Sequence, residues 1–185
     1  MRIRLLSELV LGVALTLGLV ATSPVLAAPW LTFTEVSYHP RDEKLEFVEI
    51  HHLDAPGIDL GGWRLAGEIT FEFPRGTRLE PHETIVIARD LEAFRAKHPT
   101  VTKVVGPFEG RLDNKGGRIE LRHRAGGLIA EMEYGRDGAW SSVADGTGHT
   151  LVLADGSFDP LAPESWIPSA RPGGSPGIFE ATLRS

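Results

Sequence analysis

The chain has 185 residues, which suits one domain with a short extra segment better than two independent cores. Its composition of 42% hydrophobic and 24% charged residues is ordinary for a globular protein and excludes a largely disordered chain. The formal net charge of -6 provides no overall positive field for a polyphosphate. The absence of cysteine excludes disulfides, thiolate metal sites and cysteine nucleophiles. Glycine (21) and proline (13) together disfavour helix bundles.

Residues 1–27 have the features of a secretory signal peptide. Arg2 and Arg4 precede the apolar run 9–20, and small residues suit cleavage after Ala27. The run is shorter than the roughly 20 residues that a membrane-spanning helix needs. Glu8 beside the run keeps an uncleaved anchor open as the alternative. Cleavage would change the formal net charge from -6 to -7 by removing two arginines and one glutamate. We therefore predict a secreted or periplasmic protein with no stable membrane span after cleavage.

From Trp30 onward the chain is a series of short runs with the two-residue alternation and β-branched or aromatic content of strands. These runs cover 31–38, 45–52, 63–67, 69–73, 84–89, 101–105, 117–123, 128–134 and 149–153. Clusters of Gly, Pro, Asp and Asn separate them, as in turns. Short strands separated by turns at such regular intervals predict an all-β fold, an antiparallel β-sandwich.

One short helix and an extended C-terminal arm complete the prediction. The helix covers 90–98, where Asp90 can cap the first turn and Pro99 ends the last. The Pro-, Gly- and Ser-rich stretch from Asp155 onward is typical of an arm laid over the sandwich and fixed by Trp166. The predicted domain spans 30–178, and residues 179–185 are expected to fray.

Three stretches, taken in order, resemble the lamin tail domain, an immunoglobulin-like sandwich of nuclear lamins and of many bacterial exported proteins. The first combines TEV 34–36, EFVEI 46–50 and DLGGWRL 59–65; the second FPRGTRLEP 73–81 and IVIA 85–88; the third LDNKGGRIEL 112–121, DGTGHTL 145–151, Trp166 and PGGSPG 172–177. The resemblance implies an interaction module and supplies no catalytic, cofactor-binding or metal-binding residue. Trp63 beside its glycine pair is expected in the core. The sequence departs from the family at His82, where glycine is common.

Two motifs that could carry chemistry have a better structural interpretation. The GGSPG run at 173–177 matches a hydrolase nucleophile elbow, but no strand precedes it, no helix follows it, and Pro176 lacks the N–H that an oxyanion hole would use. His51 and His52 are adjacent on a predicted strand, so they point to opposite faces and cannot grip one ion from one surface. The other five histidines, which show no ligand spacing, are His39, His82, His98, His123 and His149.

The late loops carry carboxylates that leave one enzymatic alternative open. A small metal-assisted hydrolase of the phosphodiester class could use Asp137, Asp145, Asp155 and Asp159. Asp followed by Gly is equally a turn signature, and the spacing fails that of an EF-hand. DGTG at 145–148 likewise favours a turn over a phosphate cradle, because no lysine and no helix follow it as in a P-loop.

Polymer ligands are weakly supported. A local basic patch comprises Lys115, Arg118, Arg122, Arg124 and Arg136, but Glu120, Glu131 and Glu133 interrupt it, so nucleic acid is an unfavoured partner. A single amide side chain, Asn114, is a poor basis for carbohydrate binding, although Trp30 and Trp140 could be exposed. The sequence favours an exported, noncatalytic binding or adhesion module without cofactor or metal. Its partner is expected to be a protein or cell-envelope component, held through a sheet edge or end loops; ligand identity and oligomeric state stay open.

Overall fold

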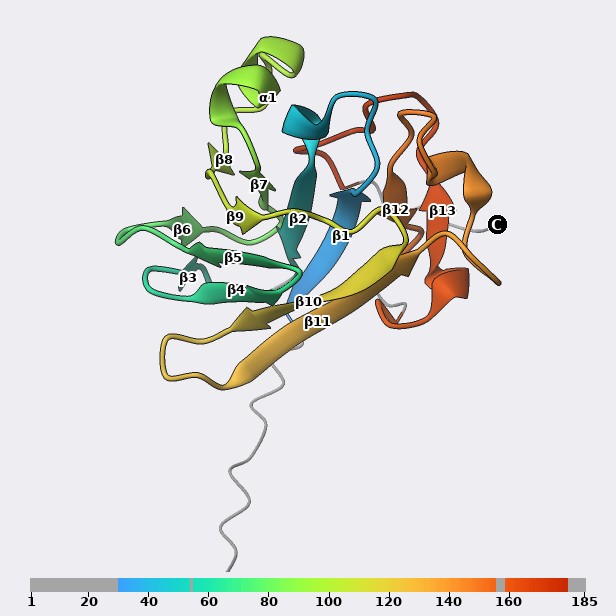
Figure 1. The fold of residues 1–185 in the computed structure, drawn as a ribbon. Helices are drawn as coiled ribbons and strands as arrows, with labels where there is room; N and C mark the ends of the chain where they lie inside the picture. The colour runs from blue at the N-terminus through green and yellow to red at the C-terminus, as the bar shows by residue number, and fades with distance from the viewer. Residues whose placement is uncertain (1–29, 54, 156–158, 180–185) are drawn as a thin grey trace, which may run out of the picture.

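The computed structural model describes residues 30–53, 55–155 and 159–179, arranged as two packed β-sheets (Figure 1). The predicted signal peptide, 1–27, and residues 180–185 of the predicted tail lie outside the described residues. The strands are β1 (Leu31–Ser37), β2 (Phe47–His52), β3 (Ile58–Asp59), β4 (Arg64–Gly67), β5 (Ile69–Glu72), β6 (Arg78–Leu79), β7 (Thr84–Ala88), β8 (Val104–Val105), β9 (Glu109–Gly110), β10 (Gly116–Arg122), β11 (Leu128–Gly135), β12 (Leu151–Leu153) and β13 (Trp166–Pro168). Short 3-10 turns cover Glu43–Leu45, Ser142–Ala144 and Pro163–Ser165.

Six strands form one sheet in the order β13-β12-β1-β2-β7-β8, and five form the other in the order β11-β10-β4-β5-β9; β3 and β6 pair as a small ribbon. The antiparallel sandwich that the sequence predicts is confirmed, with one exception. β8 runs parallel to β7, with Val86 opposite Val104. A parallel pair needs a long crossover connection, and the helix between β7 and β8 provides it.

The main core lies between the two sheets and follows the alternation of the strands. Val36, Val48 and Ile50 face inward from β1 and β2, and Leu65, Ile119 and Met132 face them from the other sheet. Trp63 is 4% exposed and belongs to this core, as the sequence predicts. Burying a side chain of this size removes on the order of 150 to 250 Å² from water, which makes Trp63 a principal anchor of the sandwich.

A second, smaller core lies on the outer face of the six-stranded sheet, under helix α1 (Leu91–Lys97). Asp90 caps the helix as predicted, because its carboxylate accepts the backbone N–H groups of Glu92 and Ala93 at 3.0 Å each. Phe94 packs edge-on against Phe47 of β2, with ring centroids 5.6 Å apart. No helix among the residues that the structure describes is long and apolar enough to cross a membrane.

The structure changes two predicted elements. The strand predicted at 101–105 is reduced to Val104–Val105, because the N–H of Val101 closes the helix end by bonding to His98 O at 3.1 Å. The C-terminal arm begins later than expected, because residues 166–168 form strand β13. Trp166 lies opposite Leu153, so the tryptophan is fixed through a sheet pairing as well as by burial.

Candidate functional site

The segment that follows β13, residues 169–179, crosses the outer face of the six-stranded sheet; we call it the C-terminal strap. In chain order, its contacts are Ser169 N to Thr150 O (2.9 Å), Gly173 N to Gly148 O (2.6 Å), Ser175 N to the Glu35 carboxylate (3.1 Å), Gly177 N to the Glu49 carboxylate (2.6 Å) and the Phe179 ring to the His51 ring (4.8 Å). The strap therefore passes over β12, β1 and β2 in turn. Phe179, expected to fray, packs against β2.

Two buried glutamates hold the strap. Glu35 of β1 and Glu49 of β2 lie opposite each other in register, and each is 1% exposed. Thr150 donates its hydroxyl to Glu35 Oε1, and Thr34 donates its hydroxyl to Glu49 Oε1, both at 2.6 Å. The strap N–H groups complete the set of donors. Four donors from the chain itself satisfy this pair, which indicates a structural role.

Burial controls the ionisation of both groups. Desolvation, followed by repulsion from Glu49, raises the pKa of Glu35 to about 8. Desolvation also raises the pKa of Glu49 to about 7, against the opposing hydrogen bonds of Thr34 and Gly177. Neither carboxylate is among the functional residues that the sequence predicts. In the sequence, each glutamate stands beside apolar residues of a strand, in TEV 34–36 and in FVEI 47–50. This pattern can be interpreted correctly only together with the distant PGGSPG run at 172–177.

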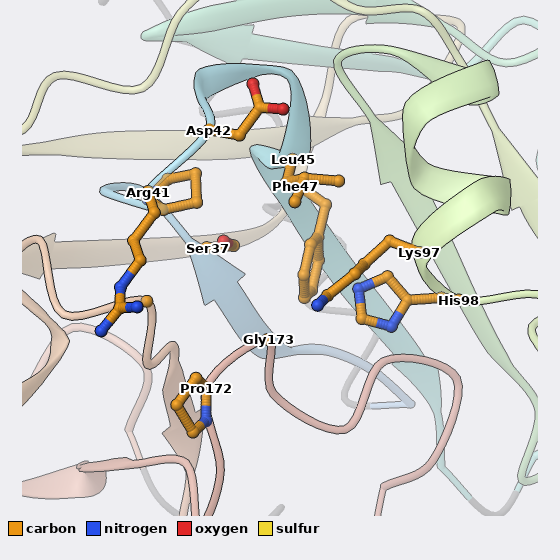
Figure 2. Close-up of a pocket in the computed structure, with 11 residues that line it drawn as sticks. Ser37, Arg41, Asp42, Leu45, Phe47, Lys97, His98, Pro172 and Gly173 are labelled. Carbon is orange, nitrogen blue, oxygen red and sulfur yellow. The ribbon is translucent and has the colours of Figure 1, made fainter.

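A half-open pocket of about 180 Å³ lies where the strap begins; we call it the strap pocket (Figure 2). It is lined by Ser37, Pro40, Arg41, Asp42, Leu45, Phe47, Lys97, His98, Gly148, Pro172 and Gly173. Figure 2 shows Lys97 and His98 together beside the ring of Phe47, with Pro172 and Gly173 of the strap forming the opposite wall. Four segments that are distant in sequence meet here: the connection from β1 to β2, the end of α1, the loop at Gly148 and the strap.

The longest strand at an edge of either sheet is β11, whose eight residues pair on one side with β10. On its other side, Glu133 donates its backbone N–H to Pro160 O at 3.1 Å. Glu131 lies two residues earlier and so points its N–H and C=O the same way. Within the described ranges, no backbone bond reaches Glu131 from that side.

The histidines lie in separate environments. His51 faces outward and its Nδ1 lies 3.0 Å from Thr84 Oγ1, whereas His52 is fully buried with neither ring nitrogen hydrogen-bonded among the described residues. Burial lowers the pKa of His51 to about 4. No cluster of three or more His, Asp or Glu side chains able to hold a metal occurs in the described part of the chain.

Three of the four late-loop carboxylates that the hydrolase alternative requires have cationic or backbone partners in the described structure. Asp145 Oδ1 lies 2.6 Å from His39 Nδ1, and Arg136 approaches both Asp145 (3.9 Å) and Asp137 (3.8 Å). Asp159 accepts the backbone N–H of Leu161 at 2.9 Å. Asp155 lies in the described region after β12. The 145–148 stretch is a turn, with Gly146 and Gly148 at positive φ.

The basic patch is balanced by its own neighbours. Arg118 contacts Glu131 and lies 3.8 Å from Glu133, and Arg122 lies 2.7 Å from Glu120. Each ion pair reduces the local positive potential that a nucleic acid would require. Lys115 and Arg124 are exposed beside them.

The other residues selected from sequence lie apart. Ser175 of the GGSPG run lies in the strap, with no regular strand before it and no helix after it among the described residues. Trp30 is 38% exposed, as carbohydrate binding would require, while Trp140 is half-buried against the core. Asn114 lies in the turn before β10.

Comparison with known proteins gives one informative match. The model of the family described as Lamin Tail Domain matches residues 25–136, more than half of the chain. No curated protein matches this sequence. The matched region contains β1 to β11, and β12, β13 and the strap follow it. The fold prediction of an immunoglobulin-like sandwich is confirmed, and the chain belongs to the lamin tail domain family.

Proposed function

We propose that this protein is an exported, noncatalytic binding module that holds a protein or cell-envelope component through the free edge of β11. The observation that carries the proposal is the outward-facing backbone of Glu131 on an eight-residue edge strand. An exposed strand edge offers a row of N–H and C=O groups to which an extended segment of a partner can add. The signal peptide predicted at residues 1–27 supports export.

The side chains along β11 favour an ordered docking surface. Leu128, Ile129 and Ala130 at its start are half-buried, and the latter two pack against the main core. Glu131 and Glu133 follow them and pair with Arg118 of β10. A partner strand that adds to β11 would therefore lie beside apolar side chains at the start of β11 and beside carboxylates further along it. The carboxylates favour a partner segment with basic side chains near that end.

Substitution of Glu131 by proline tests the edge directly. Proline removes the outward N–H that a partner would use, and proline is tolerated on an edge strand where that N–H faces solvent. The protein, expressed from its full reading frame, is incubated with envelope fractions and isolated envelope proteins at moderate salt. Retention of the wild type is expected, with at least about tenfold weaker retention of Glu131→Pro.

Glu131→Ala is the matched control. It removes the same carboxylate and the ion pair with Arg118, but keeps the backbone N–H. Its retention should fall far less than that of Glu131→Pro, because only the side-chain charge is lost, and far-ultraviolet circular dichroism should show that both variants keep the sandwich. Equal retention of the proline variant would assign binding to another surface. A wild type that is enriched on none of the fractions would contradict the binding module itself.

A further inference from the structure

The strap pocket has an apolar interior that suits a compact ring. Phe47, Leu45, Pro40 and Pro172 provide carbon surface around a volume of about 180 Å³. An engineered apolar cavity of about 150 Å³ accommodates benzene. The strap pocket is half-open, so a ring can enter while a polar substituent stays near its mouth.

The charged groups around this interior favour an anion. Lys97 and Arg41 are exposed, and neither has a carboxylate partner within the described ranges. Arg41 donates its Nε–H to Thr147 O at 3.1 Å, and Asp42 accepts the backbone N–H of Lys44 at 3.1 Å. Figure 2 shows Asp42 turned away from Phe47, whereas the Lys97 amine lies beside that ring.

His98 adds a polar group at the same wall. Burial and the neighbouring charge of Lys97 lower the pKa of His98, so its imidazole is neutral at pH 7. A neutral ring can donate one hydrogen bond and accept another. Figure 2 shows the Asp42 carboxylate turned outward. Of the ionic side chains in the described lining, Lys97 is the one that the figure shows beside Phe47.

The pocket wall is preformed. Gly173 donates its N–H to Gly148 O at 2.6 Å, and Ser175, two residues on, is held by Glu35. A β-carbon on Gly173 would lie 3.6 Å from the His98 ring, which shows how closely the strap approaches the helix end. A preformed wall lowers the ordering cost of binding, so a small ligand need not close the site itself.

We propose that the strap pocket binds an apolar carboxylic acid whose body is about the size of one six-membered ring. The ring lies against Phe47 and Leu45, and the carboxylate pairs with the Lys97 amine. The same chemistry occurs in a free aromatic acid and in the carboxyl end of a polypeptide that terminates in phenylalanine. The site is independent of the β11 edge and does not rest on the proposed function.

Benzoate is the probe, and backbone amide shifts in ¹H–¹⁵N spectra of the protein are the readout. Shifts are expected at Gly148 and Gly173, and benzoate should bind about tenfold more tightly than benzyl alcohol, which has the ring without the charge, or acetate, which has the charge without the ring. A short peptide ending in phenylalanine is titrated with its terminus free and amidated. Tighter binding by the free peptide than by benzoate would identify a polypeptide terminus as the source, and the reverse a free acid.

Two lysines provide the matched comparison. Lys97→Ala should weaken benzoate binding about fivefold to tenfold, while Lys44→Ala, which removes an equal charge from a residue outside the lining, should leave it unchanged. Leu45→Trp fills the pocket without changing charge and should abolish the shifts at Gly173. The proposal fails if benzyl alcohol binds as tightly as benzoate or if Lys97→Ala binds like the wild type. It also fails if no shift appears in the strap pocket at about 10 mM ligand.

Discussion

Glu35 and Glu49 lie opposite each other on adjacent strands, and each accepts a backbone N–H from the same C-terminal strap. The stretches around Glu35, Glu49 and Ser175, which are distant in sequence, therefore form one structural unit. Two carboxylates this close cannot both ionise without repulsion in a buried site, and one of them is best kept protonated. The pair joins β1, β2 and residues 169–179 through hydrogen bonds rather than through apolar contact.

This pair makes stability depend on pH. The pKa values of about 8 for Glu35 and about 7 for Glu49 lie above the ordinary value of 4.5, so the folded protein binds more protons than the unfolded chain between these limits. The free energy of unfolding must therefore fall as the pH rises through that window. His51, whose pKa is lowered to about 4, has the opposite effect below pH 6.5. Urea denaturation between pH 6.5 and about 8.5 keeps the opposite effect of His51 out of the measurement.

Glu35→Gln should flatten this dependence. The glutamine cannot ionise, so the decline in unfolding free energy should become shallower by up to about 1.4 kcal/mol per pH unit. Glu133→Gln, which changes a half-exposed carboxylate on β11, should keep the wild-type slope. A slope that is the same in the wild type and in Glu35→Gln would contradict protonation of this pair in the fold.

Gly174→Ala should release the strap. A β-carbon there would collide with Glu35 Oε1 and lie 2.8 Å from Thr150 Oγ1, and the backbone has φ +73°. Gly126 has φ +90° with nothing within 4 Å, so Gly126→Ala measures the conformational strain alone, about 1 kcal/mol. Loss of the strap's hydrogen bonds, which leaves a buried carboxyl group unsatisfied, should cost Gly174→Ala about 1–3 kcal/mol more in urea denaturation. Equal losses in the two variants would show that the carboxylates do not hold the strap.

The sequence predicts best those strands in which apolar and polar residues alternate because one face of the strand is buried in the core. β1, β2 and β7 lie within the predicted ranges because Phe33, Val48 and Ile85 face one core. The two-residue strands β3, β6 and β9 are too short to show any period, and they exist only because a neighbouring strand pairs with them. The parallel pairing of β8 depends likewise on a crossover that no local pattern encodes.

The sequence predicts the strap as an arm over the sandwich, but the carboxylates that hold it and the strap pocket could not be predicted, for a related reason. The period of β1 and β2 places Glu35, Glu49 and His51 on the face that normally meets solvent, and only a segment over a hundred residues away buries them. The strap pocket joins Phe47 and Lys97 with Pro172. Local periodicity describes one element at a time, so a site made of four segments gives no such signal.

Trp63 offers a test of the core. Its side chain is 4% exposed and its indole Nε1 has no hydrogen-bond partner among the described residues, so packing alone accounts for its contribution. Trp63→Ala should lower the free energy of unfolding by about 3–5 kcal/mol. Trp63→Phe keeps most of the ring and loses no hydrogen bond, so it should cost less than half as much. Chemical denaturation measures both, and similar losses would point to a polar role for the indole.

His82 has φ +62° and is the sole non-glycine residue at positive φ in the described part of the chain. The resemblance to the lamin tail domain leads us to expect glycine at this position. A side chain in the left-handed region costs roughly 1–2 kcal/mol, part of which glycine recovers. His82→Gly should therefore raise the free energy of unfolding by up to about 1 kcal/mol, measured by urea denaturation. The backbone bond from His82 N to His52 O, 2.8 Å long, is kept in that variant.

The control for this prediction is His82→Ala. Alanine removes the imidazole but keeps the β-carbon that the left-handed backbone disfavours, so it should not become more stable than the wild type. A gain confined to the glycine variant assigns the effect to backbone strain. If both variants are destabilised alike, interactions of the imidazole outweigh that strain, and the departure from glycine at this turn is stabilising.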